Sequence, residues 1–470
     1  MQMPATTGRG FTGVYMMIRW MMALALLGAM AGASFAEAPL QVGTFKLDVT
    51  PPMGTPLCDA LCVPASALDD PLSARGVVLV PAGQQPIVLV ALDWTGVGND
   101  GQDAWKEAIA AAAGTTVDRV AIHALHQHDA PGCDFGADKL AQEHGLGGKL
   151  FNVEFAREAI AKTAAAVKAA TAATQPATHI SSGVGVVEKV ASNRRCLGPD
   201  GKVSLVRFTA SKDPRAKSEP EGIIDPKARA IGFWNGDTPI AILTYYATHP
   251  QSYYGKGRIS ADFPGMARSM REEAVPGPLH VHFNGAGGNI GAGKYNDGSP
   301  EMRPELARRL AAGMAAAWES SEKVPIVADS IDWATTEVAL PVGKHLVEEE
   351  MLAQLADESI TEHSRLQTVR HLQFLRECEA GRKVTLSRLR IGDVDLVQLP
   401  GELFVEYQLA AQDLRPESAV CVAAYGDYGP GYIGLHDSYA QGGYETSPGA
   451  SRVAPSVEGV LMKGIQELLK

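Results

Sequence analysis

Short apolar runs rich in β-branched residues alternate with helical stretches along residues 37–470, and no linker, repeat or charge block interrupts them. This alternation predicts one mixed α/β domain, with central mixed sheets flanked by helices. The apolar runs predict strands at 77–81, 87–92, 119–124, 204–208, 239–246 and 280–283, and a hairpin over 384–399. Helical periodicity predicts helices at 103–112, 152–171, 263–273 and 304–319, and a broken helix over 348–379. The polar segment 211–223 is expected to be an exposed loop.

Residues 1–36 have the pattern of an export signal rather than of a folded segment. Arg19 precedes a short apolar run over 20–30, and small residues lead up to Ala36. This order is typical of a secretory signal peptide. The run is too short to span a bilayer comfortably, and no cysteine follows it to carry a lipid anchor. We therefore expect cleavage near Ala36 and an exported protein, periplasmic or secreted, without a stable membrane anchor.

The charge balance excludes several classes of partner. The chain has 42 Lys and Arg residues against 53 Asp and Glu residues, which gives a net charge of −11. Non-specific binding to nucleic acid or to an anionic membrane surface needs the opposite sign. With 46% apolar and 20% charged residues, the chain is also too hydrophobic to be intrinsically disordered. We expect a small-molecule or lipid substrate and no nucleic acid, and the sequence leaves the oligomeric state open.

All six cysteines follow the export signal, and an even number in an oxidising compartment permits up to three disulfides. Cys58 and Cys62 are close enough in sequence to pair within one loop. They could instead bind a metal, although no second close cysteine pair completes a structural zinc site. The sequence leaves both alternatives open for this pair.

The densest group of chemically active side chains lies in the segment 121–132, which begins as a strand and ends at a Pro-Gly turn. Side chains two residues apart on an extended backbone face the same side, so His126 and His128 are expected to point together. Two such imidazoles can both bind a metal, or one can bind the metal while the other transfers protons. The alternative is a polar strand end whose histidines are only hydrogen-bonded.

Three further features could belong to the same site. His249 ends a predicted strand, and Glu402 follows the predicted hairpin in a Pro-Gly-Glu sequence. A carboxylate there can bind a metal or cap the following helix. A second His-x-His pair, His280 and His282, precedes the glycine-rich segment 284–293, which lacks the lysine of a phosphate-binding loop. We expect this segment to line the site or to pack tightly beside it.

In this order, the segments resemble the catalytic domain of the neutral/alkaline, non-lysosomal ceramidases, zinc amidases that split ceramide into sphingosine and fatty acid. The matches run from about residue 40 to about residue 450, and their order and number carry the resemblance. They fall at 42–51, 126–132, 193–194, 248–250, 400–402 and 432–445. The resemblance implies that residues 37–470 form a catalytic domain of this type.

The resemblance also implies a zinc site made by two histidines, a glutamate and a tyrosine, which fall on His126, His249, Glu402 and Tyr432. Zinc accepts such nitrogen and oxygen ligands and activates the water that attacks the amide carbon. By the same resemblance, His128 moves a proton or binds the developing oxyanion, Tyr444 donates to that oxyanion, and Arg194 lies near the substrate. The implied function is that of an exported zinc-dependent amidohydrolase acting on an N-acyl lipid such as ceramide.

Two departures from the family bear on the substrate. The family's glycine loop usually reads Gly-Asp-Val-Ser, and Gly288-Asn-Ile-Gly291 stands in its place, so substrate contacts through Gly288, Asn289 and Gly291 are expected to differ. Full-length ceramidases carry a C-terminal immunoglobulin-like domain, which we expect to be absent because the chain ends about 25 residues after Glu445. The alternative functions are a zinc esterase or amidase with a smaller substrate, and a non-catalytic binding protein on the same fold.

Overall fold

The computed structural model describes residues 1–5 and 39–470, and the first five contain no helix or strand. The export signal predicted at 1–36 therefore lies outside the described residues, apart from these five. Residues Pro39–Lys470 form one compact unit. No helix in the described part of the chain combines the length and the hydrophobicity of a membrane span.

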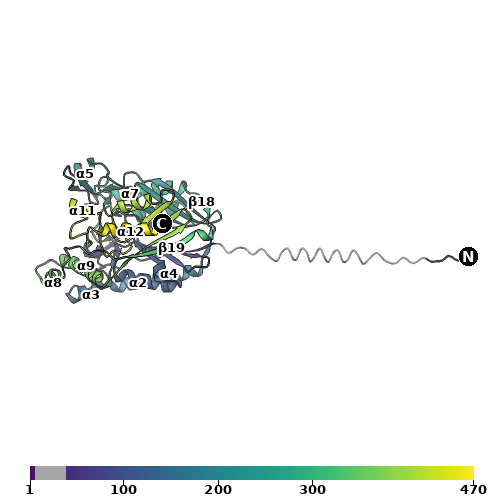
Figure 1. The fold of residues 1–470 in the computed structure, drawn as a ribbon, viewed down its shortest axis with the longest axis horizontal. Coiled ribbons are helices and arrows are strands. Elements are labelled where there is room, and N and C mark those ends of the chain that lie inside the picture. The colour runs from purple at the N-terminus through teal and green to yellow at the C-terminus, as the bar shows by residue number, and fades with distance from the viewer. Residues whose placement is uncertain (6–38) are drawn as a thin grey trace. The chain divides into compact units, whose positions relative to one another are not determined.

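Three sheets form the centre of this unit (Figure 1). The first has the order β6-β4-β3-β1-β8 and comprises β1 (Leu40–Asp48), β3 (Ser73–Pro81), β4 (Ile87–Leu92), β6 (Val120–Ala124) and β8 (Gln175–Ala177). The second has the order β16-β14-β13-β9-β18 and comprises β9 (His179–Val186), β13 (Lys227–Asn235), β14 (Thr238–Tyr246), β16 (Leu279–Asn284) and β18 (Glu322–Pro325). The third has the order β19-β20-β21-β23 and comprises β19 (Ile331–Val338), β20 (Val384–Ile391), β21 (Val394–Gln398) and β23 (Ala419–Ala423).

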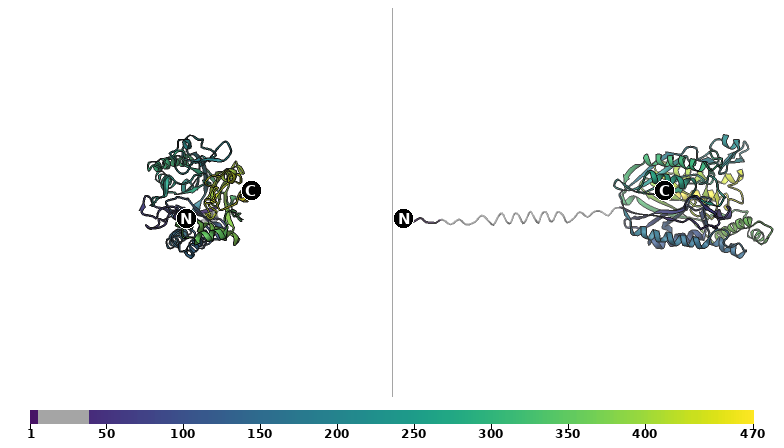
Figure 2. Two further views of the ribbon diagram at one scale, coloured as in Figure 1. Left: turned by 90° about the vertical axis from the view of Figure 1, so that its left-hand side faces the viewer. Right: turned by 180° about the vertical axis from the view of Figure 1, so that it is seen from behind.

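Helices cover the outer faces of these sheets. Figures 1 and 2 place α4 and α7 on opposite sides of the strands. The first sheet is covered by α2 (Asp100–Ala113) and α4 (Val153–Ala172), the second by α6 (Asp262–Ala274) and α7 (Met302–Glu319), and the third by α10 (Val405–Asp413) and α12 (Val457–Leu469). The remaining helices are α3 (Phe135–Glu143), α5 (Pro214–Ser218), α8 (Glu348–Ala356), α9 (Glu362–Glu379) and α11 (His436–Gln441).

The inner faces of the three sheets share one apolar core, to which Leu89, Phe233 and Leu396 each contribute from a different sheet. Every residue of β4 is buried, because α2 lies over one face of its sheet and the shared core lies against the other. Helix α4 shows how the sequence directs this packing. Asn152 caps its first turn, and its buried residues recur at helical spacing on one side.

The predicted mixed α/β class is confirmed, and the predicted elements are present with shifted ends. The hairpin turns at Gly392 as expected, and the break in the long helix falls between α8 and α9. The segment 211–223 is largely exposed, as predicted, but it is not a loop throughout. This segment contains α5, which starts at the Asp213 cap, and the Arg207 guanidinium donates to carbonyls at its end, including that of Ala216.

Three strand–helix–strand units carry parallel strand pairs, which are β4-α2-β6, β14-α6-β16 and β21-α10-β23. The carboxyl ends of these strands lead into the segments that hold His126, His249 and Glu402. Ligands of α/β proteins commonly bind at the carboxyl ends of parallel strands. Short two-stranded ladders join these segments, namely β5 (Gly96–Val97) with β7 (Gly132–Cys133), β10 (Ser192–Asn193) with β17 (Ile290–Gly291), β11 (Arg195–Leu197) with β12 (Val203–Val206), β2 (Ala67–Leu68) with β15 (Arg258–Ile259), and β22 (Glu402–Leu403) with β24 (Tyr432–Ile433).

Candidate metal centre

His126 follows β6 in a left-handed backbone conformation with φ of 69°. Its N–H donates to the Trp94 carbonyl at 2.8 Å, and its ring stacks on Tyr425 with the centroids 4.8 Å apart. Nδ1 lies 2.6 Å from the Thr95 carbonyl, which can only accept, so Nδ1 carries the ring hydrogen. The unprotonated Nε2 therefore faces the centre of the site. Backbone strain of this kind is typical of functional sites.

His249 follows β14 and is oriented in the same way. Its Nδ1 donates to the Gly287 carbonyl at 2.6 Å, which leaves Nε2 as an acceptor. The Tyr432 hydroxyl donates to this Nε2 at 3.0 Å. Burial lowers the pKa of His249, so the ring is neutral. A ring nitrogen fixed by a carbonyl behind it is the usual arrangement of a metal-binding histidine.

Glu402 brings a carboxylate between the two imidazoles. Its Oε2 lies 3.2 Å from His126 Nε2 and 3.1 Å from His249 Nε2. Among the described residues this buried oxygen has no hydrogen-bond donor. Burial raises the pKa of Glu402 and its contacts with His126 and His249 lower it; the lowering is the larger effect, so Glu402 is a carboxylate. An ionised carboxylate is the protonation state that metal binding requires.

Tyr432 and Arg194 complete one side of the centre. Arg194 is buried, and its Nη1 donates to the Tyr432 hydroxyl at 3.0 Å. Its Nε lies 3.1 Å from Glu445 Oε1, so the guanidinium is fixed between the phenol and a buried carboxylate. The four predicted ligands thus lie close together; they are His126, His249, Glu402 and Tyr432. Their nitrogen and oxygen donors, with an orphaned carboxylate oxygen among them, fit a zinc ion.

His128 lies beside this set rather than within it. The side-chain nitrogens of His126, His128 and His249 could also hold a metal, since they lie within 4.8 Å of one another. However, both ring nitrogens of His128 have other partners. Nδ1 donates to the His126 carbonyl at 3.1 Å, and Nε2 accepts from Gln251 at 3.0 Å. Burial lowers the pKa of His128, which leaves a neutral ring.

The pattern of His126 and His128 predicts an extended backbone, but the backbone that carries them is not extended. The strand ends at Ala124, and the left-handed residue His126 turns the chain. The His126 and His128 rings still meet, with centroids 4.7 Å apart, because the turn brings them edge to face. The expectation that they point together is correct, and its physical reason is the turn rather than strand alternation.

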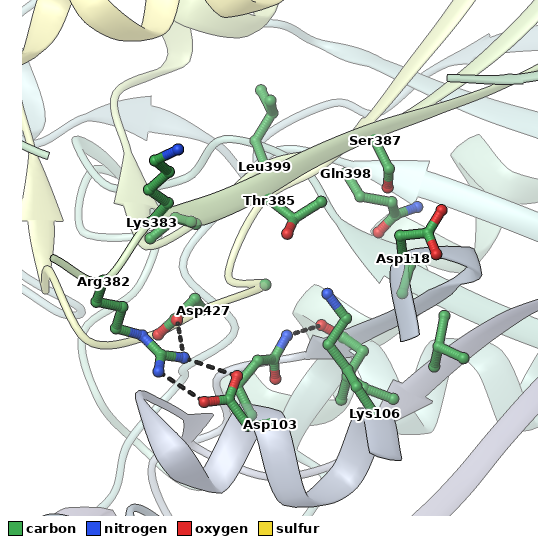
Figure 3. A pocket seen from close by; sticks show the side chains of 16 residues that line it. Asp103, Lys106, Asp118, Arg382, Lys383, Thr385, Ser387, Gln398, Leu399 and Asp427 are labelled. Carbon is green, nitrogen blue, oxygen red and sulfur yellow. Dashed lines mark hydrogen bonds and ion pairs between the residues drawn. The ribbon is translucent and has the colours of Figure 1, made fainter. Parts of the chain in front are cut away.

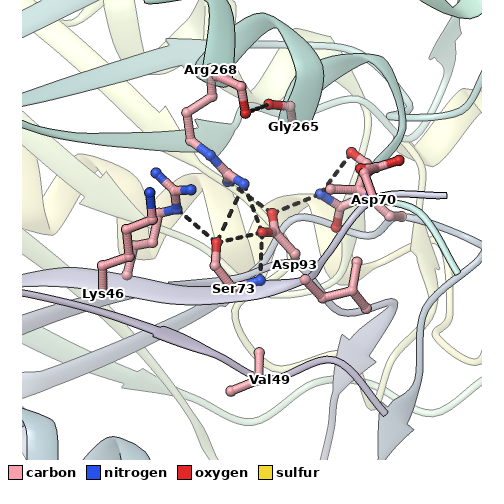
Figure 4. A network of polar contacts seen from close by, with 12 residues as sticks. Lys46, Val49, Asp70, Ser73, Asp93, Gly265 and Arg268 are labelled. Atoms are coloured by element: carbon pink, nitrogen blue, oxygen red, sulfur yellow. Dashed lines mark hydrogen bonds and ion pairs between the residues drawn. The ribbon is translucent and has the colours of Figure 1, made fainter. Parts of the chain in front are cut away.

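The side chain between these two histidines anchors their loop from behind. Gln127 donates to Asp93 Oδ1 at 3.0 Å. Asp93 is fully buried, and it also accepts from Ser73 at 2.6 Å and from both terminal nitrogens of Arg268 (Figure 4). These contacts lower the pKa of Asp93 to about 2 against the effect of burial, so the anchor is a carboxylate.

Aromatic side chains surround the buried centre at the surface. Tyr444, Phe208 and Tyr254 are 43%, 47% and 42% exposed. The Tyr444 ring lies 5.6 Å from that of Tyr432 and 5.7 Å from that of Phe208, and the Tyr254 ring lies 4.7 Å from that of His128. The predicted oxyanion donor Tyr444 is therefore at the rim, next to a ligand candidate.

The glycine loop packs against the centre. A Cβ on Gly288 would meet the Glu402 carbonyl oxygen at 2.2 Å, so only glycine allows this approach. The Asn289 side-chain N–H donates to Glu406 Oε2 at 2.9 Å, and its Oδ1 accepts from the Val405 N–H at 2.8 Å. Gly291 faces the Arg194 side chain, which a Cβ there would meet at 3.5 Å. Gly288 and Asn289 are thus engaged in packing and hydrogen bonds within the protein, whereas the space beside Gly291 is less tight.

Some residues at the site were not found from the sequence. Gln251 orients His128, Tyr425 stacks on His126, and Glu445 holds Arg194. Gln251 lies two residues after His249, and Glu445 adjoins Tyr444, so sequence proximity to predicted residues was the available signal. The pair His280 and His282 lies elsewhere: His282 Nδ1 contacts the Thr244 hydroxyl, and His280 Nε2 donates to the Val275 carbonyl.

Several cavities within residues 39–470 lie apart from the metal centre. Figure 3 shows a polar one of about 50 Å³, in which Arg382 binds Asp103 and Asp427. A cavity of this size holds a few water molecules rather than a substrate. A larger cavity of about 510 Å³ is lined by Asn289 and Arg195. Arg194, the residue before Arg195, lies between β10 and β11 and points to the metal centre instead.

The sequence matches no known family model and no curated protein significantly. Two solved structures, however, share the fold. A ceramidase complexed with C2 aligns with a TM-score of 0.67 at 17% identity, covering 92% of this chain and 75% of its own. The neutral ceramidase from Pseudomonas aeruginosa aligns with a TM-score of 0.67 at 18% identity, covering 92% and 74%. The chain therefore has the fold of the neutral ceramidases, as the sequence resemblance predicts.

Proposed function

We propose that this chain is an exported zinc-dependent amidohydrolase of the ceramidase type, which hydrolyses the amide bond of an N-acyl lipid. The observation that carries the proposal is the buried meeting of His126 Nε2, His249 Nε2 and Glu402 Oε2 at 3.1 to 3.2 Å, beside Tyr432. In this proposal residues 1–36 are removed on export, and residues 37–470 form the catalytic domain.

In the proposed mechanism His126, His249, Glu402 and Tyr432 hold the zinc ion. When bound, zinc polarises the amide carbonyl and lowers the pKa of water. The neutral His128 points its Nε2 lone pair at the Gln251 amide, so in this proposal the attacking water replaces that amide as the partner of Nε2, gives His128 a proton, and the proton passes to the leaving amine. The Tyr444 hydroxyl donates to the carbonyl oxygen as negative charge develops there. Arg194 orients Tyr432 and adds positive charge on the same side.

The rim of the site supports a lipid substrate. Phe208, Tyr254 and Tyr444 are each more than two fifths exposed next to the buried centre. Exposed aromatic rings, two of which end in a hydroxyl, suit a substrate that is apolar on one end and polar on the other. A long-chain N-acyl amide has this character, and ceramide is the first substrate to test.

The test is fatty-acid release from a fluorescent ceramide in mild detergent, using the chain from Glu37 onward, loaded with zinc. We expect release that a chelator abolishes and that zinc restores. His126→Ala should lose both bound zinc and release, whereas the control His436→Ala should keep both, because His436 is exposed on α11.

Each other outcome has a distinct meaning. A zinc-loaded, folded chain that releases no fatty acid from ceramide but hydrolyses short amides or esters would favour the smaller-substrate enzyme. Bound zinc with no turnover of amides or esters would favour a binding protein. Full activity in His126→Ala would contradict the ligand assignment.

A further inference from the structure

A short turn with an unusual backbone packs against the candidate metal centre. Leu57 and Cys62 form an isolated antiparallel bridge, and Cys58, Asp59 and Ala60 between them have φ of 50°, 51° and 67°. Residues with a side chain rarely adopt this left-handed conformation, and three in succession are rarer still. Such a turn persists only when the surrounding contacts determine it fully.

The two cysteines face each other inside this turn. Cys58 is 2% exposed and Cys62 is 7% exposed, and the neighbouring Cys62 together with burial raises the pKa of the Cys58 thiol well above its ordinary value. The Cys62 thiol also lies 3.6 Å from the His128 carbonyl oxygen, to which it donates. The turn therefore places the two cysteines next to His128, a residue of the candidate site.

Further contacts tie the turn to the loop of the metal centre. The Cys58 N–H donates to the Ala130 carbonyl at 2.8 Å. The Asp59 carboxylate binds Arg370 at 2.9 Å, so it is not free to bind a metal with the cysteines. Among the described residues, a close group of three side chains that could hold a metal is formed by His126, His128 and His249, and it includes neither cysteine. The metal alternative for Cys58 and Cys62 is therefore disfavoured.

We propose that Cys58 and Cys62 form a disulfide bond that fixes this turn under His128. Each thiol loses its proton, a sulfur–sulfur bond forms, and the two electrons reduce a disulfide oxidant such as oxidised glutathione to two thiols. The covalent bond closes a ring of five residues, and the Leu57–Cys62 bridge already holds the two ends of this turn together. The inference does not depend on the proposed hydrolytic activity.

The surroundings explain why the bond, once formed, is stable. The neighbouring Cys62 and burial raise the pKa of the Cys58 thiol, so the reduced closed turn is unreactive. Oxidation is therefore expected when the turn is open. The flanking Leu61 and Val63, 41% and 53% exposed, show that the turn lies at the surface. Closing the turn then shields the disulfide from reductants.

The chain offers a direct test by mass spectrometry. Trypsin cleaves after Lys46 and Arg75, and no Lys or Arg lies between them, so Cys58 and Cys62 share one peptide. The other four cysteines lie on four separate peptides and serve as internal controls. The purified full chain is unfolded and refolded in glutathione disulfide, so that the turn passes through its open state, and is then unfolded again and alkylated with iodoacetamide with and without prior reduction.

Without reduction, we expect the 47–75 peptide to carry no alkyl group and to be lighter than the dithiol by two hydrogen atoms. Reduction should add two alkyl groups. Two alkyl groups without reduction would overturn the proposal, as would glutathione attached to either cysteine or a disulfide to one of the control peptides. Cys62→Ala should leave Cys58 alkylated under all conditions.

A melting experiment tests whether the bond fixes the turn. The oxidised chain should melt a few degrees higher than the reduced chain, and the double variant Cys58→Ser/Cys62→Ser should melt at one temperature in both states. The control Cys378→Ser should keep the difference, because Cys378 lies on α9. Equal melting temperatures for the oxidised and reduced chain would show that the disulfide does not stabilise the turn.

Discussion

Glu402 and Tyr432 are direct partners in the two-residue parallel ladder of β22 and β24. The Glu402 N–H donates to the Gly431 carbonyl at 2.9 Å, so the backbone itself fixes the spacing between the two side chains. The Tyr432 ring also stacks on that of His249, with the planes 9° apart. The backbone pairing therefore holds together, as one unit, two ligand candidates that lie 30 positions apart in the sequence.

The first prediction concerns the charge of this unit. Glu402→Gln keeps the shape of the side chain but removes the negative charge between His126 and His249. We expect zinc affinity to fall by more than about 100-fold, since even changes outside the ligand shell cost 10- to 100-fold. Competition with a fluorescent chelator measures this. The conservative Glu402→Asp should retain part of the affinity, and unchanged zinc binding in Glu402→Gln would exclude Glu402 as a ligand.

The second prediction separates two glycines of one loop. Gly288→Ala places a Cβ 2.2 Å from the Glu402 carbonyl oxygen and should cost about 1–3 kcal/mol of unfolding free energy. Gly291→Ala places its Cβ at an ordinary 3.5 Å from Arg194 and should be nearly neutral. Urea unfolding of the zinc-free proteins compares them. Equal losses in both variants would show that the close packing is not specific to Gly288.

The third prediction concerns the buried anchor of the histidine loop. Asp93→Asn leaves the Arg268 guanidinium buried without its carboxylate and should cost about 3–5 kcal/mol. Because Asp93 also binds Gln127, zinc affinity should fall together with stability. Calorimetry and zinc titration of the same variant measure both. The exposed pair Lys323 and Asp237 provides the control, since Asp237→Asn should change neither quantity.

The fourth prediction is a pH dependence that belongs to His282. Burial lowers the pKa of this histidine to about 3, well below the ordinary value near 6.5. The unfolded chain then binds more protons than the folded chain between these values, so the contribution of His282 to stability falls as the pH falls from 6.5 towards 3. Each pH unit in that window is worth about 1.4 kcal/mol at most.

The measurement is the difference in unfolding free energy between the wild-type chain and His282→Gln at several pH values. The difference is needed because burial raises the pKa of Asp129 to about 6 and that of Asp134 to about 7, and these groups act with the opposite sign. We expect the wild type to lose stability relative to the variant on acidification. A difference that does not change between pH 7 and pH 4 would contradict the assignment.

Local patterns in the sequence were sufficient for the element types. The apolar runs identified β4 and β14, and the Gly392-Asp393 turn identified the β20–β21 hairpin, because hydrophobic periodicity and turn chemistry act over a few neighbouring residues. Helix α5 was missed, because the carbonyls at its end are held by Arg207, which lies in a different segment.

The sequence alone determined which residue types were available for a metal site, and the resemblance of their order to a known family selected four of them. Only the tertiary structure decided how they meet. Parallel pairing of β22 with β24 sets Glu402 beside Tyr432, and the left-handed turn at His126 aims its ring. Gly288 is needed because the Glu402 backbone approaches it closely. Such contacts join residues far apart in the chain, so no local pattern in the sequence encodes their geometry.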